Sequence, residues 1–122
     1  MSQDIYREEI LDNYQHPKNK GKLAKASSTA SVYNTLCGDF IKVELMVKDD
    51  VVKDIRFDGD GCAISQAAAS MLTEKVKGMS VKKVASLKKD DVLKLLKISL
   101  SPTRLRCGLL ALDAIQQAIK RQ

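Results

Sequence analysis

The sequence contains no tryptophan and few aromatic residues of any kind. Aromatic side chains make up 4% of the 122 residues, so a nucleic-acid-binding protein would have few platforms on which bases could stack. No apolar run approaches the roughly 20 residues that a membrane-spanning helix needs. We therefore expect neither a nucleic-acid partner nor a membrane segment.

The positive charge of the chain leaves one alternative open. A net charge of +6 is compatible with nucleic acid or with an acidic protein surface. A basic nucleic-acid-binding module would use a set of scattered lysines: Lys18, Lys20, Lys22, Lys25, Lys75, Lys77, Lys82 and Lys83. Aromatic residues do not interleave with these lysines, so we favour a solvated basic surface.

Cysteine is also scarce, with three residues and therefore an odd number. The sequence has no signal-peptide pattern and no short Cys-x-x-Cys clip, so a disulfide framework is not expected. A reducing cytoplasm would keep all three cysteines as thiols, and we expect a cytoplasmic protein.

The surroundings of the cysteines favour ligand chemistry. Cys37 lies two residues before Asp39 in a glycine-containing turn, and Cys62 ends the run Asp-Gly-Asp-Gly-Cys. Such turns let the backbone approach an ion closely. Any one of these cysteines, taken alone, could equally be a small buried hydrophobe. Three thiolates, from Cys37, Cys62 and Cys107, together with one carboxylate would suit zinc or an iron-sulfur cluster with an oxygen ligand.

The hydrophobic pattern predicts a single domain over residues 1–122 that mixes strands and helices. Alternating apolar residues predict a β-hairpin over 40–57 that turns at Asp49 and Asp50, and a further strand within 26–35. Helical patterns occupy the remaining segments: 3–14, 64–77, a short stretch after Ser80, 90–96, and 102 to the C-terminus. Because a hairpin returns the chain to the edge where it began, Cys37 and Cys62 are predicted to be neighbours.

Three blocks around the cysteines resemble one known family. The blocks are Cys37-Gly38-Asp39, the stretch 59–71 around Cys62, and the stretch 106–115 that opens with Arg106-Cys107. With the opening segment 6–21, they resemble the IscU, NifU N-terminal and SufU family of iron-sulfur cluster assembly scaffolds. The resemblance covers essentially the whole chain.

The resemblance implies an α+β fold in which a small antiparallel β-sheet packs against helices. It implies a site made by Cys37, Asp39, Cys62 and Cys107 that holds a transient 2Fe-2S cluster, with iron as a substrate and zinc possible in the cluster-free state. It also implies a scaffold or carrier rather than an enzyme. Sulfur would come from a cysteine desulfurase, and the cluster would pass to recipient apoproteins.

Other features bear on the subtype within this family. Arg106 stands where IscU-type members carry histidine, which resembles SufU, whereas the compact interval 78–106 is closer to IscU. The segment 100–104 differs from the Leu-Pro-Pro-Val-Lys segment of IscU, which makes a DnaK-type chaperone a doubtful partner. The alternative function is a SufU-like, zinc-dependent sulfurtransferase. In that alternative Cys37 is the candidate acceptor of a persulfide, because its glycine-bearing loop could swing toward a desulfurase.

Overall fold

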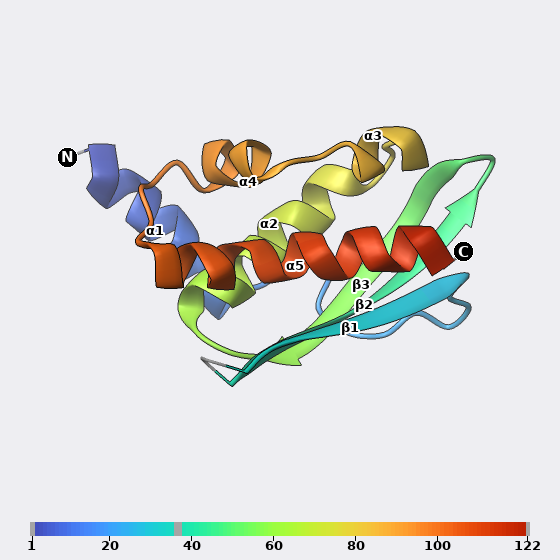
Figure 1. The fold of residues 1–122 in the computed structure, drawn as a ribbon, viewed down its shortest axis with the longest axis horizontal. Helices are drawn as coiled ribbons and strands as arrows, with labels where there is room; N and C mark the ends of the chain where they lie inside the picture. The colour runs from blue at the N-terminus through green and yellow to red at the C-terminus, as the bar shows by residue number, and fades with distance from the viewer. Residues whose placement is uncertain (1, 36–37, 122) are drawn as a thin grey trace.

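The structure is a computed structural model that describes residues 2–35 and 38–121. Helices flank a run of three strands in this part of the chain (Figure 1). The elements in chain order are α1 (Ser2–Gln15), β1 (Ser28–Asn34), β2 (Asp39–Lys48), β3 (Val51–Asp60), α2 (Ala63–Val76), α3 (Val81–Ala85), α4 (Lys89–Leu96) and α5 (Pro102–Arg121). The predicted α+β fold, with a small antiparallel sheet packed against helices, is confirmed.

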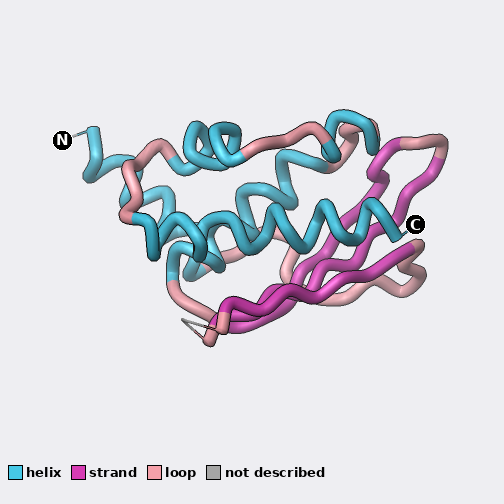
Figure 2. The backbone as a smooth tube through the Cα atoms, viewed as in Figure 1, coloured by secondary structure: helices cyan, strands magenta, loops and turns pink. Residues whose placement is uncertain are grey.

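The strands form one antiparallel sheet in the order β1-β2-β3. Figure 2 shows them as a twisted layer below the helices. Side chains alternate between the two faces of a strand, and along β2 the residues Ile41, Val43 and Leu45 are fully buried on the helix side. The predicted hairpin therefore exists as β2 and β3, and the predicted first strand exists as β1.

The hairpin turn is built from two residues in the left-handed conformation. Asp49 has φ 55° and Asp50 has φ 59°, which is the pattern of a type I′ turn. A register irregularity lies close to this turn, between Met46 and Val47 of β2. This irregularity shifts the alternation of β3 by one residue, so that both Val52 and Ile55 can point into the core.

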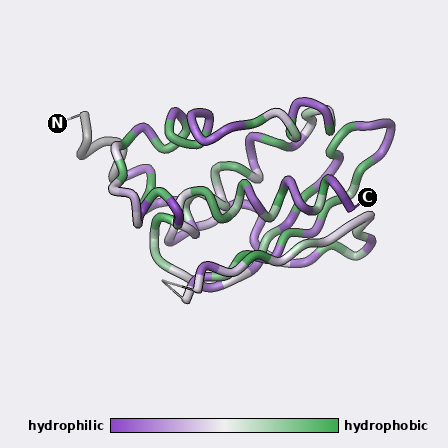
Figure 3. The backbone as a smooth tube through the Cα atoms, in the orientation of Figure 1, coloured by the Kyte–Doolittle hydropathy of each residue, from purple (hydrophilic) through white to green (hydrophobic). Residues whose placement is uncertain are grey.

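Two helices cover one face of the sheet. The long helix α5 packs against β1 and β2, while α2 packs against β3, α5 and α1 (Figure 1). Hydrophobic and hydrophilic residues alternate along α5, as an amphipathic helix requires (Figure 3). The large side chains that are fully buried come from both layers: Phe57, Ile41, Leu45, Ile55, Leu72, Leu96 and Ile115 are among them.

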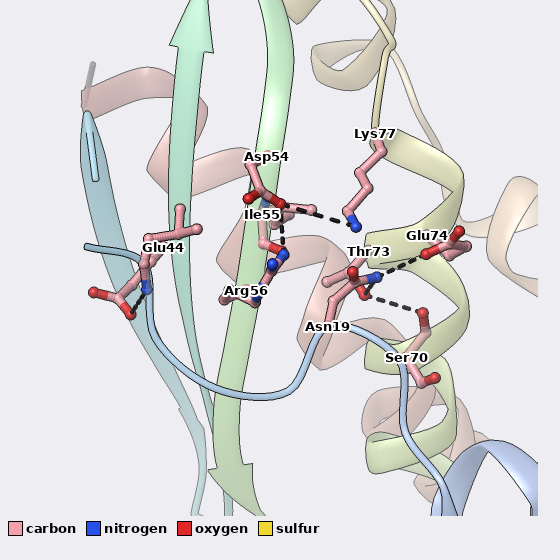
Figure 4. A network of polar contacts seen from close by, with 10 residues as sticks. Asn19, Glu44, Asp54, Ile55, Arg56, Ser70, Thr73, Glu74 and Lys77 are labelled. Carbon is pink, nitrogen blue, oxygen red and sulfur yellow. Dashed lines mark hydrogen bonds and ion pairs between the residues drawn. The ribbon is translucent and has the colours of Figure 1, made fainter. Parts of the chain in front are cut away.

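The connection from α1 to β1 fastens the sheet to α2 through polar contacts (Figure 4). The Asn19 side chain donates to Thr73 Oγ1 at 3.1 Å and to Glu74 Oε2 at 3.0 Å. On its other side, the backbone of Asn19 and Gly21 exchanges hydrogen bonds of 2.9 Å with Phe57 in β3. The connection thus holds the outer edge of β3 next to α2.

The last helix begins where the sequence predicts. Pro102 is its first residue, and the Ser101 hydroxyl accepts a hydrogen bond from the backbone N–H of Arg104 at 3.4 Å. This start fixes which turn of α5 contains Cys107.

Among the described residues, no helix has both the length and the apolar character needed to cross a membrane.

Candidate metal centre

Asp39 introduces a carboxylate into the hydrophobic face of the sheet. It is the first residue of β2 and lies on the same face as Ile41 and Val43. Asp39 is 4% exposed, and its Oδ2 atom has no hydrogen-bond partner among the described residues. Leaving a buried polar atom unsatisfied costs about 1–3 kcal/mol. A carboxylate in this position is a candidate ligand, because it contributes nothing to apolar packing.

Cys62 sits in the turn that joins β3 to α2. It is partly buried and occupies the N-cap position of α2, with extended backbone angles of φ −70° and ψ 167°. Its carbonyl oxygen accepts hydrogen bonds from the Ser65 hydroxyl at 3.0 Å and from the Gln66 N–H at 3.1 Å. The position of Cys62 is therefore fixed by the first turn of the helix that follows it.

Cys107 approaches the same place from α5. It is 2% exposed. Its neighbour Gly108 lies where α5 packs on α2, since a Cβ at Gly108 would be in van der Waals contact with Ile64 Cγ2 of α2 at 3.7 Å. This close approach brings the second turn of α5 to the start of α2.

The three residues converge on one point. One ligand atom from each of Asp39, Cys62 and Cys107 lies within 4.8 Å of the other two. Zinc holds thiolate sulfurs at about 2.3 Å, which places the sulfurs of a tetrahedral site about 3.8 Å apart. Small side-chain movements would bring these atoms to that spacing. The unsatisfied Asp39 oxygen and the two thiols form a donor set that fits zinc or iron.

Cys37, the remaining candidate ligand and the candidate persulfide acceptor, lies outside the described residues. The chain on its C-terminal side is ordered by a turn in which the Gly38 N–H donates to the Asn34 carbonyl oxygen at 2.9 Å. Gly38 has φ 71°, a left-handed conformation that glycine adopts without strain. This turn leads directly into Asp39. The membership of Cys37 in the site stays a prediction.

A groove runs beside the site between β1 and α5. It has a volume of about 310 Å³, and its lining residues are Val32, Tyr33, Asn34, Thr35, Arg106, Leu109, Leu110 and Asp113. Tyr33 is 69% exposed and stacks on Phe40 with ring centroids 5.6 Å apart. Desolvation raises the pKa of Asp113 above the usual value for aspartate. Arg106 lines this groove as an exposed side chain.

Sequence reasoning did not single out two residues that touch the centre. Gly61 faces the Asp39 carboxylate, and a Cβ there would lie 2.7 Å from Asp39 Cγ. Ser65 contacts the Cys62 backbone, as described above. The only signal for Ser65 in the sequence is its place in the first turn of the helix predicted over 64–77.

Comparisons with known proteins place the chain in a family. The family model described as the NifU-like N terminal domain matches residues 5–122. The zinc-dependent sulfurtransferase SufU of Bacillus subtilis is 31% identical over 135 residues, covering 97% of this chain and 91% of that protein. The iron-sulfur cluster assembly scaffold protein IscU 1 of Archaeoglobus fulgidus is 35% identical over 115 residues, covering 94% of this chain and 74% of that protein.

The fold agrees with these relatives. A crystal structure of the N-terminal part of a nitrogen-fixing NifU-like protein from Brucella abortus matches with a TM-score of 0.80 and 25% identity, covering 97% of this chain and 94% of that one. The resemblance seen in the cysteine blocks is therefore confirmed. Since the family model spans nearly the whole sequence and both relatives exceed 30% identity, the chain belongs to the NifU-like N-terminal domain family.

Proposed function

We propose that this single-domain chain is a scaffold for de novo assembly of a 2Fe-2S cluster. The observation that carries the proposal is the convergence of a buried, unsatisfied carboxylate with two thiols at one end of the sheet. A family relative is named as an iron-sulfur cluster assembly scaffold, which supports the same reading. Cys37, Asp39, Cys62 and Cys107 would hold the cluster, which is cargo and not a resident cofactor.

Sulfur enters through Cys37 in this proposal. The Cys37 thiolate attacks the outer sulfur of a persulfide on a cysteine desulfurase. The sulfur-sulfur bond of the donor breaks, a new one forms at Cys37, and the donor cysteine leaves as a thiolate. This exchange between the two cysteines is redox-neutral, and the later conversion of the Cys37 persulfide into cluster sulfide would take two electrons per sulfur from a thiol or other electron donor.

The partners follow from this role. A cysteine desulfurase delivers sulfur, and recipient apoproteins accept the finished cluster. The chain acts as a carrier and not as an enzyme, and it works in the cytoplasm. A DnaK-type chaperone stays a doubtful partner, because segment 100–104 reads Leu-Ser-Pro-Thr-Arg.

The second candidate function is a zinc-dependent sulfurtransferase that accepts a persulfide from the desulfurase. Arg106 beside the third cysteine favours it, as does the likeness to SufU over 91% of that protein's length. The same four residues would bind zinc. Zinc would fix the geometry of the thiols, and Cys37 would still be the sulfur acceptor.

Anaerobic reconstitution with iron and with sulfur generated by a desulfurase separates the two functions. The scaffold predicts visible absorption from the cluster, equal amounts of bound iron and sulfide, and transfer to an apo-ferredoxin. A colourless protein that keeps zinc and stimulates the desulfurase would replace the scaffold function with the alternative. A protein that shows neither property would exclude both.

A trapping experiment tests the entry point of sulfur. After brief incubation with a desulfurase and cysteine, a thiol-reactive label should mark persulfide at Cys37 before it marks Cys62 or Cys107, because Cys107 is 2% exposed and Cys62 is only partly exposed. Mass spectrometry of the labelled peptides gives the order. Labelling of Cys107 first would move the acceptor role to α5.

A further inference from the structure

We infer that Gly61 and Ser65 are positioning residues that place the Asp39 carboxylate among the cysteine thiols. The inference deepens the proposed function and rests on it, because it takes Asp39 to be a ligand. Gly61 lies on the turn between β3 and α2 and Ser65 lies in the first turn of α2, whereas Asp39 lies at the start of β2. They would therefore set the geometry of a ligand that belongs to another element.

The carboxylate occupies the space that any side chain at position 61 would need. A Cβ built on Gly61 would lie 2.7 Å from Asp39 Cγ and 2.9 Å from Asp39 Oδ1. Carbon atoms in contact normally lie about 3.5–4.0 Å apart. Gly61 is not among the residues with positive φ, so space and not backbone conformation requires glycine here.

The described part of the chain supplies no donor to the second carboxylate oxygen. Asp39 Oδ2 is buried without a hydrogen-bond partner among the described residues. By contrast, Asp54 on β3 contacts both Arg56 and Lys77 (Figure 4). Packing against its neighbours would therefore position the Asp39 carboxylate, and Gly61 is one of these neighbours.

Ser65 lies next to Gly61. It is fully buried, and its Oγ would lie 2.6 Å from a Cβ on Gly61, so the hydroxyl and the carboxylate flank the same point. The hydroxyl donates to the Cys62 carbonyl oxygen at 3.0 Å. This bond fixes the turn that carries Gly61, and it leaves the Asp39 oxygen free of a competing donor. Ser65 thus couples the positions of Cys62 and Asp39.

Metal affinity measures this positioning directly. We would titrate metal-free protein with Zn²⁺ in competition with a chelator and record the visible spectrum of the Co²⁺ form. Gly61→Ala should weaken Zn²⁺ binding about tenfold or more, as loss of support for a ligand does, and its Co²⁺ spectrum should match that of Asp39→Ala. Ser65→Ala should weaken binding by a smaller factor. Ser86→Ala is the matched control, because Ser86 also donates its hydroxyl to the carbonyl oxygen three residues earlier, but it lies at the end of α3 and outside the ligand group, so this variant should bind as wild type does.

A double substitution shows whether Gly61 acts through Asp39. In an Asp39→Ala background, Gly61→Ala should cause no further loss of Zn²⁺ affinity, since the group it displaces is already absent. Circular dichroism and thermal unfolding verify that each variant is folded, and Ser65→Ala tests the same packing without adding volume. Wild-type affinity in Gly61→Ala, or losses that multiply in the double variant, would overturn the inference. Equal Zn²⁺ affinity of wild type and Asp39→Ala would instead overturn the ligand role of Asp39 in the proposed function.

Discussion

The two ends of the β2–β3 hairpin carry aspartates in opposite surroundings. At the turn, Asp49 and Asp50 are exposed, and both adopt the left-handed conformation that a type I′ turn requires. At the open end, Asp39 is 4% exposed and has a buried oxygen without a partner. The same residue type therefore supports the fold at one end and opposes it at the other.

The contrast between the exposed turn aspartates and the buried Asp39 indicates where a polar residue lowers the stability of the fold. Aspartate tolerates the left-handed backbone conformation that the turn requires. Because both turn aspartates are exposed, neither places a charge in the core. Asp39 instead continues the buried row of Ile41, Val43 and Leu45, where an apolar residue would pack without an unsatisfied oxygen. A carboxylate that breaks the hydrophobic pattern beside two cysteines is what the proposed ligand role of Asp39 predicts.

The largest expected effect comes from removing a thiol at the open end. Cys107→Ser should abolish stable cluster binding, because a neutral hydroxyl is a poor substitute for a thiolate. Cys62→Ser should behave in the same way. Absorption and iron content after reconstitution measure the loss. Asp113→Asn, in the neighbouring groove but outside the ligand group, is the control and should load normally. A serine variant with the wild-type spectrum would remove that cysteine from the site.

The next effect concerns the stability of the metal-free protein. Asp39→Ala removes the unsatisfied buried oxygen, so we expect the free energy of unfolding to rise by about 1–3 kcal/mol. Chemical denaturation in the presence of a chelator measures it. Asp49→Ala is the matched substitution at the other end, and it should lower stability because alanine is disfavoured at positive φ. Equal effects of the two substitutions would contradict the contrast between the ends.

A smaller effect is expected on the rate of cluster release. A carboxylate is a harder and weaker ligand for a cluster than a thiolate, and an incoming cysteine can replace it. Asp39→Cys would complete a four-thiolate site, so transfer to an apo-ferredoxin should slow by about tenfold, which is about 1.4 kcal/mol in the barrier. Circular dichroism of the cluster during transfer gives the rate. Transfer that is as fast as in wild type would rule out a labile carboxylate.

Local patterns predicted most of the fold. Hydrophobic alternation, turn residues and a helix start signal predict the hairpin, its turn at Asp49 and Asp50, and the start of α5 at Pro102. The structure contains each of them. Hairpin topology also predicts that the chain returns near Asp39, which places Cys62 there. The close contact of Gly61 with Asp39 could not be predicted, because it depends on how two separate elements pack to within a few tenths of an ångström.

The smallest expected effect is a change in stability at the turn. It tests whether the turn and the open end of the hairpin act independently. Asp50 has φ 59°, and glycine at this position is the preferred partner of aspartate in a type I′ turn. Asp50→Gly should therefore raise the free energy of unfolding by up to about 1 kcal/mol, since glycine enters the left-handed region without the cost that a Cβ imposes.

The ten residues of β2 span roughly 30 Å, so the turn is too distant to couple directly to the site. Asp50→Gly should leave Zn²⁺ affinity unchanged, and its effect on stability should add to that of Asp39→Ala within about 0.5 kcal/mol. Denaturation of both single variants and the double variant tests this additivity. A change in metal affinity, or strong non-additivity, would mean that the hairpin transmits strain from its turn to the ligands. In that case the turn aspartates would influence metal binding as well as the stability of the fold.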